Sequence, residues 1–355
     1  MTNVVHNMAG DEAGDVVAAR DKTMIERASG ALYGLAIGDA LGMPTQLLSR
    51  ATVEMLFPVL DGFAPGPPEN DVSRGQPAGR VTDDTEQALI VADLLLEGEG
   101  QVDGHALIAR LRTWAEALPA DGGEQLGPST RRALGAAAAG LSLDETGRWG
   151  DTNGAAMRIA PVGVAVAPEP LETLVERVAA VCRPTHNTGV AIAGAAAVAA
   201  AVSVGVAGGA LDEAIAVGAA AARLGRTFGH YVAGADVAER LVWAVDLVRY
   251  LDDDDALDAV SHLIGTGMAT QEAVPAAFAL AARWPGDPWR VCLTAARLGG
   301  DSDTVGAMAG ALAGACVGSS AFPSTARETV SRVNELDLER LAVRLTRLRI
   351  TADGG

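Results

Sequence analysis

The feature that most constrains the fold of this chain is a long run without formal charge, residues 185–211. The run consists mainly of Ala, Gly and Val, and Ala has the highest intrinsic helix propensity. It is long enough to span a bilayer, but it has few of the Leu, Ile and Phe residues that drive insertion, and no aromatic belt or basic flank follows it. We therefore expect a helix that is apolar on all sides because it lies at the centre of a helical domain.

The rest of the chain has the same character. Aromatic residues make up only 4% of it, whereas 42 of the 355 residues are Gly and 49% are hydrophobic. Strands prefer β-branched and aromatic residues, and small side chains allow helix axes to approach closely, so the sequence predicts an all-α protein. We expect a disordered N-terminal tail over residues 1–21 and one all-α domain over residues 22–350. A Pro- and Gly-rich stretch, residues 57–79, predicts a long surface loop.

The charge balance restricts the class of partner. With 27 Lys and Arg against 45 Asp and Glu, the net charge is −18. A nucleic-acid binder needs a basic face, and an anionic membrane surface attracts basic segments, so we expect neither partner. The three cysteines are far apart and form no Cys-x-x-Cys pair, which argues against a zinc finger or a disulfide framework. Residues 1–20 do not resemble a secretory signal, and we expect a cytoplasmic protein.

Two clusters place carboxylates and hydroxyls where a helix is expected to begin. They are Thr82-Asp83-Asp84-Thr85 and Asp301-Ser302-Asp303-Thr304. Asp, Ser and Thr are ordinary helix N-caps, so one cluster alone is typical of capping. The second Asp of each cluster exceeds what capping needs, and adjacent carboxylates repel each other unless a cation compensates them. Hard oxygen ligands of this kind suit Mg²⁺, Mn²⁺ or Ca²⁺ rather than zinc.

Two further segments carry polar groups. Residues 151–158 contain Asn153 and Gly154, whose neighbouring small residues would let a ligand approach the backbone; a helix N-cap by Asn153 is an equally good interpretation. His186 lies at the head of the uncharged run, with no His or Cys at metal-ligand spacing. As an isolated residue it is typical of a buried hydrogen-bonding histidine.

Taken together and in this order, the clusters resemble the ADP-ribosylglycohydrolase family, which includes the dinitrogenase-reductase-activating glycohydrolase and the ADP-ribosylarginine and ADP-ribosylserine hydrolases. The matching stretches are residues 30–42, 82–85, 153–161, 185–186 and 299–304. The resemblance implies a single large orthogonal helical domain with a dinuclear cleft for two Mg²⁺ or Mn²⁺ ions. In such enzymes the ions hold the ribose hydroxyls and a water, and the bond at the anomeric carbon is hydrolysed.

The resemblance also implies roles for individual residues. The metal ligands would be Thr82, Asp83, Asp84, Asp301, Asp303 and Thr304. The substrate pocket would be lined by Asn153, Gly154, Met157 and His186.

One position departs from the family pattern. Members that remove ADP-ribose commonly have an acid/base Glu four residues after the Gly of a Gly-Asp-x-x-Gly stretch, and here that position is Gln46. A glutamine can orient a hydroxyl or a water but cannot transfer a proton. Another carboxylate could act instead, or the leaving group could need little protonation, or the activity could be reduced. We expect the catalytic residues to be Asp84, Asp303 and Gln46, with Asp39 and Glu86 as further carboxylates to consider.

Three hypotheses follow. The first is a metal-dependent glycoside hydrolase that acts on an ADP-ribosyl group attached to a protein side chain or a small acceptor. The second keeps the fold and metals but acts on a free nucleoside or a related small riboside, which Gln46 favours somewhat. The third is a non-catalytic ADP-ribose-binding or structural protein, against which the intact acidic clusters count.

Overall fold

The computed structural model describes residues 5–118 and 126–353, with side chains described between residues 21 and 351 of these ranges, and the described residues form helices and no strand. The all-α prediction is confirmed. The helices are α1 Val5–Gly42, α2 Arg50–Leu56, α3 Asp83–Glu97, α4 Gly104–Ala117, α5 Pro128–Ala138, α6 Leu143–Thr146, the 3₁₀ turn η2 Asn153–Ala155, α7 Ala160–Ala165, α8 Leu171–Cys182, α9 Gly189–Val206, α10 Leu211–Gly225, α11 Val237–Val248, α12 Asp253–Ala259, the π-helical turn η3 Val260–Ile264, α13 Thr270–Arg283, α14 Pro288–Ala296, α15 Ser302–Val317, the 3₁₀ turn η4 Ser319–Ala321, α16 Ser324–Asn334 and α17 Leu338–Asp353.

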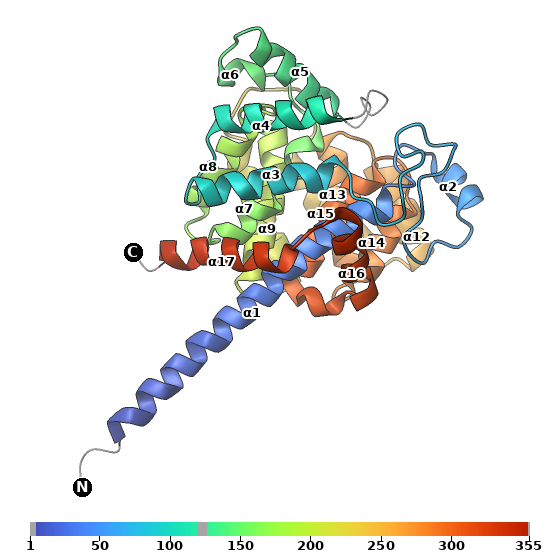
Figure 1. Cartoon of the computed structure of the whole chain (residues 1–355). Coiled ribbons are helices and arrows are strands. Elements are labelled where there is room, and N and C mark those ends of the chain that lie inside the picture. The colour runs from blue at the N-terminus through green and yellow to red at the C-terminus, as the bar shows by residue number, and fades with distance from the viewer. Residues whose placement is uncertain (1–4, 119–125, 354–355) are drawn as a thin grey trace.

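The N-terminal segment differs from the expected tail. From Val5 onward it is helical and continuous with the rest of α1, and it projects away from the body of the protein (Figure 1). The segment contains no Pro and many good helix formers, so it can extend the packed part of α1 without a break. Residues 1–4 lie outside the described part of the chain.

Helix α9 is the central helix that the uncharged run predicts. Its side chains from Ala191 to Val206 are all buried, and α7, α8, α10 and α15 pack around it. It is the one helix in the described ranges that is long and apolar enough to cross a membrane. Because other helices of the chain surround it, its apolar sides all face protein.

Helices α1 and α15 pack through glycines. A Cβ on Gly34 would lie 2.0 Å from the carbonyl oxygen of Gly310, and one on Gly38 would lie 2.0 Å from that of Gly306. The residue numbers rise along α1 as they fall along α15, so the helices run antiparallel. The two backbones can approach this closely only because both helices have glycine at every fourth position of the facing side. The contact brings the C-terminal end of α1 to the N-terminal start of α15.

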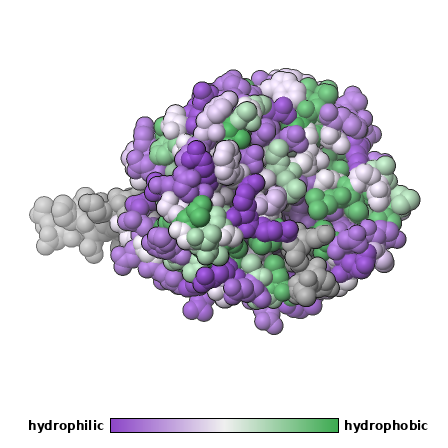
Figure 2. All heavy atoms as spheres, turned by 90° about the horizontal axis from the view of Figure 1, so that it is seen from above, coloured by the Kyte–Doolittle hydropathy of each residue, from purple (hydrophilic) through white to green (hydrophobic). Residues whose placement is uncertain are grey.

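The stretch between α2 and α3 contains no helix, as the Pro and Gly content of residues 57–79 predicts. It is not entirely a surface segment, because Asn70 and Ser73 in it are buried. The face seen from above is largely hydrophilic, with apolar residues in small separate groups (Figure 2).

Candidate metal centre

The two acidic clusters come together at the end of α1. One carboxylate oxygen from each of Asp39, Asp84 and Asp303 lies within 4.8 Å of the other two, and all three residues are buried. Asp39 lies on α1, Asp84 in the first turn of α3 and Asp303 in the first turn of α15. The glycine contact between α1 and α15 therefore determines where two of these three side chains lie.

Backbone geometry directs the second cluster into the site. Gly299 and Gly300 have φ values of 67° and 62°, in the left-handed region that glycine adopts without strain. A Cβ on Gly300 would lie 2.4 Å from the Thr266 hydroxyl oxygen. The two glycines thus allow a tight turn into α15, which begins directly after Asp301.

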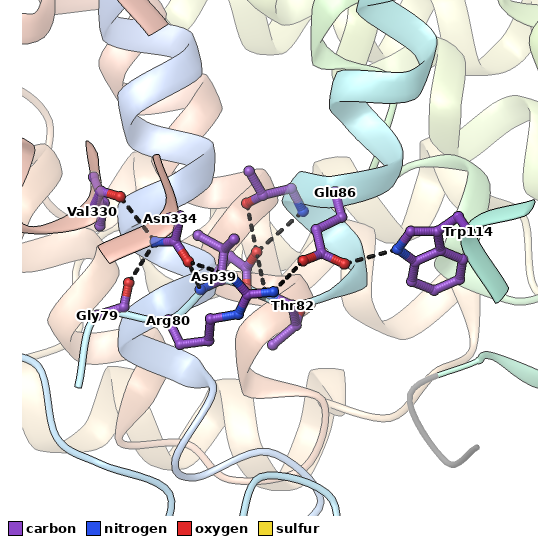
Figure 3. Close-up of polar contacts among 10 residues, drawn as sticks. Asp39, Gly79, Arg80, Thr82, Glu86, Trp114, Val330 and Asn334 are labelled. Carbon is purple, nitrogen blue, oxygen red and sulfur yellow. Dashed lines mark hydrogen bonds and ion pairs between the residues drawn. The ribbon is translucent and has the colours of Figure 1, made fainter. Parts of the chain in front are cut away.

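Asp39, rather than the clusters themselves, caps α3. Its carboxylate accepts hydrogen bonds from the Thr82 amide at 3.0 Å and the Thr85 amide at 3.1 Å, and also from the hydroxyls of both threonines (Figure 3). The side chains of the N-cap residues Thr82 and Asp301 make no capping hydrogen bond of their own. Capping by the N-cap side chains therefore does not account for the acidic clusters, although Asp303 accepts a hydrogen bond of 3.0 Å from the Thr304 amide in the first turn of α15.

The carboxylates strongly disfavour one another's charge. Burial raises the pKa of Asp84 well above its usual range, and the charges of Asp303 and Asp39 add to the effect. The pKa of Asp303 is raised in the same way, first by burial and then by Asp301 and Asp39. Burial also raises the pKa of Asp39 and that of Asp301 to about 6. Such a cluster is stabilised at neutral pH by a positive charge placed among its oxygens.

The donor set fits a divalent cation. The Oδ1 atom of Asp84 is buried and has no hydrogen-bond partner among the described residues, which is costly for a carboxylate oxygen unless a cation binds it. The available ligand atoms are carboxylate and hydroxyl oxygens, which Mg²⁺ and Mn²⁺ prefer. From the sequence, Asp39 was considered only as a carboxylate that could replace the acid/base Glu. Its place in this cluster was missed because its hydrogen-bond partner Thr82 is 43 residues away.

A pocket of about 540 Å³, including its open mouth, adjoins the cluster. Its lining includes the acidic-cluster residues Asp83, Asp301, Asp303 and Thr304, and also Asn153, Gly154 and Met157. Asn153 donates a hydrogen bond of 2.5 Å from its side-chain amide to Asp301, so this contact joins the two groups of lining residues. Asp84 does not line the pocket.

His186 lies behind the pocket wall. It is 1% exposed and is not one of the lining residues, but a Cβ on Gly154 would lie 3.0 Å from its ring. The Nδ1 atom is 2.8 Å from the Thr185 hydroxyl, and Nε2 is 3.1 Å from that of Thr152. Burial, followed by the charge of Arg158, lowers the pKa of His186 well below its usual range. The neutral ring therefore supports Gly154 from behind.

A chain of buried hydrogen bonds links His186 to the acidic cluster. Arg158 is completely buried and donates to the Thr185 hydroxyl at 2.6 Å and to the side-chain Oε1 of Gln87 at 2.8 Å. The Gln87 amide in turn donates to Asp83 at 3.3 Å. Gln87 and Arg158 were not predicted as site residues, and no local pattern in the sequence distinguishes them.

Gln46 is located at the edge of the pocket. Its side chain is 8% exposed, and its Nε2 donates to the Met43 carbonyl oxygen at 3.2 Å. It lines the same pocket as Asp83 and Asp303, so a neutral amide stands where the family pattern has a carboxylic acid.

Comparison with known proteins gives the family. The family model described as ADP-ribosylglycohydrolase matches residues 20–354. The chain belongs to the ADP-ribosylglycohydrolase family. The resemblance noted from the sequence motifs is confirmed.

Its relatives in this family differ in how much is known of them. The uncharacterized protein YegU of Escherichia coli (strain K12) is 37% identical over 91% of this chain and 97% of its own length. An uncharacterized protein of Archaeoglobus fulgidus is 31% identical over 92% of this chain and 98% of its own length. The ADP-ribosyl-[dinitrogen reductase] glycohydrolase of Rhodospirillum rubrum is 31% identical over 46% of this chain and 52% of its own.

A solved structure also resembles this ADP-ribosylglycohydrolase family member. It is titled as an ADP-ribosylglycohydrolase-related protein complex and is 28% identical, with a TM-score of 0.66, covering 92% of this chain and 99% of that one. The likeness therefore extends over the whole helical body.

Proposed function

We propose that this protein is a metal-dependent hydrolase that cleaves the bond at the anomeric carbon of a ribosyl group, foremost an ADP-ribosyl group on a protein side chain or a small acceptor. The observation that carries the proposal is the meeting of Asp39, Asp84 and Asp303 beside an open pocket, with one Asp84 oxygen left without a partner. Family membership supports hydrolase activity on ADP-ribosyl groups in general.

Thr82, Asp83, Asp84, Asp301, Asp303 and Thr304, with Asp39 added, would hold two Mg²⁺ or Mn²⁺ ions. When bound, such ions lower the pKa of a water and orient hydroxyl groups of a substrate.

The residues around this centre act on the sugar. Asn153 and Gly154 would contact the ribosyl group, because they line the same pocket as Asp301 and Asp303 and Asn153 is hydrogen-bonded to Asp301. His186 holds Gly154 in place, and a glycine there leaves room for a ligand to approach the backbone. Charge develops on the ring in an oxocarbenium-like transition state, and the nearby carboxylates of Asp83 and Asp301 stabilise that charge.

Proton transfer must proceed without a glutamate at position 46. Of the expected catalytic residues, Asp303 and Gln46 line the pocket and can contact a substrate, whereas Asp84 does not line it. We assign Asp303 to contact with the reacting groups, Gln46 to orienting a hydroxyl or a water, and Asp84 to holding an ion. We also propose that the protein works in the cytoplasm and has no nucleic-acid or membrane partner.

The absence of an acid at Gln46 favours a second candidate, hydrolysis of a free nucleoside or similar small N-riboside. Its leaving group can depart with less help from an acid than an amine or alkoxide needs.

A substrate panel tests both candidates. The purified full chain is incubated with Mg²⁺ or Mn²⁺ and either an arginine- or serine-linked ADP-ribosylated peptide or a set of nucleosides, and released sugar is measured. We expect release that chelation by EDTA stops. Release from nucleosides alone would reject the first candidate, and no release from any substrate would leave the non-catalytic hypothesis.

A further inference from the structure

A second cavity lies on the other side of Gln46 from the metal-centre pocket. Its volume, with the open mouth included, is about 1170 Å³, and both Gln46 and Thr82 line it, whereas the adjacent Asp83 lines the first pocket. The two cavities therefore flank the same acidic cluster, and the Gln46 side chain faces both. The assigned site residues Gln46 and Thr82 border this second space, but the roles given to them so far do not assign it a ligand.

The second cavity has apolar and polar walls, and the loop on one side of it is held in place by hydrogen bonds. Met43, Val72 and Val333 line it together with the Trp114 indole. The loop above it is held by Asn334 at the end of α16, whose side chain donates to the Gly79 carbonyl oxygen at 2.8 Å and accepts from the Val81 amide at 3.1 Å (Figure 3). An indole in the lining suits a planar ligand, because rings stack on indole faces.

The charged groups of the cavity are already paired with each other. Glu86, the carboxylate among the described lining residues, accepts from Arg80 at 2.5 Å and from the Trp114 Nε1 at 2.8 Å (Figure 3). Both of its oxygens are therefore engaged. A cationic ligand such as a guanidinium would find no free carboxylate here, so the cavity favours a neutral ligand.

Neutral polar groups remain available for such a ligand. Ser73 lines the cavity, is 0% exposed, and its hydroxyl has no hydrogen-bond partner among the described residues. A buried hydroxyl without a partner is uncommon in proteins. A change of the Ser73 rotamer that brings this hydroxyl to the cavity surface would let a ligand atom satisfy it. The Gln76 side chain also lines the cavity and makes no hydrogen bond with the described residues, while Gln46 uses only its amide nitrogen.

We propose that the second cavity takes the leaving group of the hydrolysis and that this group is a neutral planar heterocycle of the nucleobase class. The inference rests on the second candidate of the proposed function, hydrolysis of a small N-riboside, and deepens it by giving the leaving group a place in the fold. The bond between C1 of the ribosyl group and the ring nitrogen breaks, the hydroxyl of a water joins C1, and the remaining proton of that water goes to the departing nitrogen.

The Ser73 hydroxyl donates to the departing base, and Trp114 stacks on it. No carboxylic acid is needed at position 46 for this reaction, because a heterocycle delocalises the negative charge as it leaves. The substitution at Gln46 and the second cavity are then two parts of one substrate preference.

Binding measurements on the full chain test the proposal. With Mn²⁺ present, adenine, hypoxanthine, uracil and nicotinamide are titrated by calorimetry, with arginine as the cationic probe and ADP-ribose as the probe of the first pocket. We expect at least one neutral base to bind and arginine not to compete with it. Val333→Trp, which fills the cavity, should abolish base binding and leave Mn²⁺ affinity within about twofold; ADP-ribose, which carries an adenine of its own, is expected to weaken only if its base enters this cavity. The same change at the partly exposed Val242 of α11 is the matched control.

Ser73→Ala gives an independent readout if Val333→Trp fails to fold. It should weaken base binding by roughly tenfold, as the loss of one buried hydrogen bond predicts. Absence of base binding, or base binding unchanged in both variants, would overturn the inference and leave Ser73 to hold a water. Hydrolysis of an ADP-ribosyl peptide without base binding would reject the inference alone. Base binding in the cavity without hydrolysis of any riboside would reject both the leaving-group role and the proposed function, and the two failures are thus distinguishable.

Discussion

Gly38 of α1 and Gly306 of α15 lie so close that a Cβ on Gly38 would approach the Gly306 carbonyl oxygen to 2.0 Å. The residue that follows Gly38 is Asp39, and Asp303 lies one helical turn before Gly306. Because the backbones are in contact here, the two carboxylates lie close enough to belong to one cluster. Packing between two helices and assembly of the candidate metal centre therefore depend on the same glycines.

Gly38→Ala is expected to weaken both the packing of α1 against α15 and the binding of metal. The added methyl group has no space, and overpacking of this kind typically costs about 1–3 kcal/mol of unfolding free energy or more. We expect a lower melting temperature and weaker Mn²⁺ binding, measured by thermal unfolding and calorimetry. The matched control is Gly135→Ala in α5, where a Cβ would meet nothing within 4 Å. It should be neutral or stabilise by about 0.5–1 kcal/mol. Equal behaviour of the two variants would contradict the proposed role of the contact.

Asp84→Asn should have opposite effects on the metal-free and metal-loaded protein. Removing one of several mutually repelling buried charges should stabilise the metal-free form at pH 7 by on the order of 1–2 kcal/mol. The same change should remove most of the stabilisation that Mn²⁺ confers. Thermal unfolding with and without Mn²⁺ measures both effects. Asp93→Asn, on an exposed position of the same helix, is the control and should change neither. A destabilised metal-free variant would argue that Asp84 has a purely structural role.

The stabilisation by metal should increase with pH. Burial raises the pKa of Asp39 and of Asp301 to about 6, so the folded metal-free protein binds more protons than the unfolded chain between about pH 4 and 6. The stability that these groups contribute is present below pH 4 and is lost as the pH rises through 6.

A cation replaces the lost protons, so added Mn²⁺ should raise the melting temperature more at pH 7.5 than at pH 5. At a concentration of 100 times its Kd, the gain is about 2.7 kcal/mol. The lowered pKa of His186 makes the folded protein less stable as the pH falls below 6.5. This effect is the same with and without metal, so it cancels when the two melting temperatures are subtracted. A metal effect that is independent of pH would contradict the assignment.

Gln46→Glu should change substrate preference. A carboxyl group at the edge of the pocket can protonate a poor leaving group, and general acid catalysis contributes about 10²–10⁴-fold. We expect faster release from an ADP-ribosylated peptide and little gain with nucleosides, measured as kcat/KM for each. Gln101→Glu makes the same chemical change on an exposed residue far from the pocket lining and should have no effect. An unchanged profile for Gln46→Glu would show that the position does not take part.

The sequence predicted the helical class and the acidic clusters because both depend on local signals. Alanine-rich runs specify helices such as α9, and paired acidic residues at helix starts point to a cation. The sequence could not distinguish capping from metal binding at Thr82. That distinction depends on Asp39, which reaches the start of α3 from another helix.

Other features arise only from tertiary packing. The position of His186 behind Gly154 and the Arg158 chain depend on contacts between separate helices. The second cavity is formed by the loop after α2, by α4 and by α16, and no single segment carries its pattern. The helical continuation of α1 through residues 5–21 also differs from the tail expected there; the lack of an apolar periodicity in that segment gave no sign of a helix.

Metal uptake by the full chain tests the central claim most directly. Mn²⁺ is titrated into metal-free protein and into the Asp303→Asn variant, with bound metal counted by calorimetry and by elemental analysis after dialysis. The account predicts two ions per chain for the parent protein and a large loss of binding in the variant, while both remain helical by circular dichroism. No uptake by the folded parent, or equal uptake by the variant, would contradict the claim that α3 and α15 bring their acidic residues together to bind divalent cations.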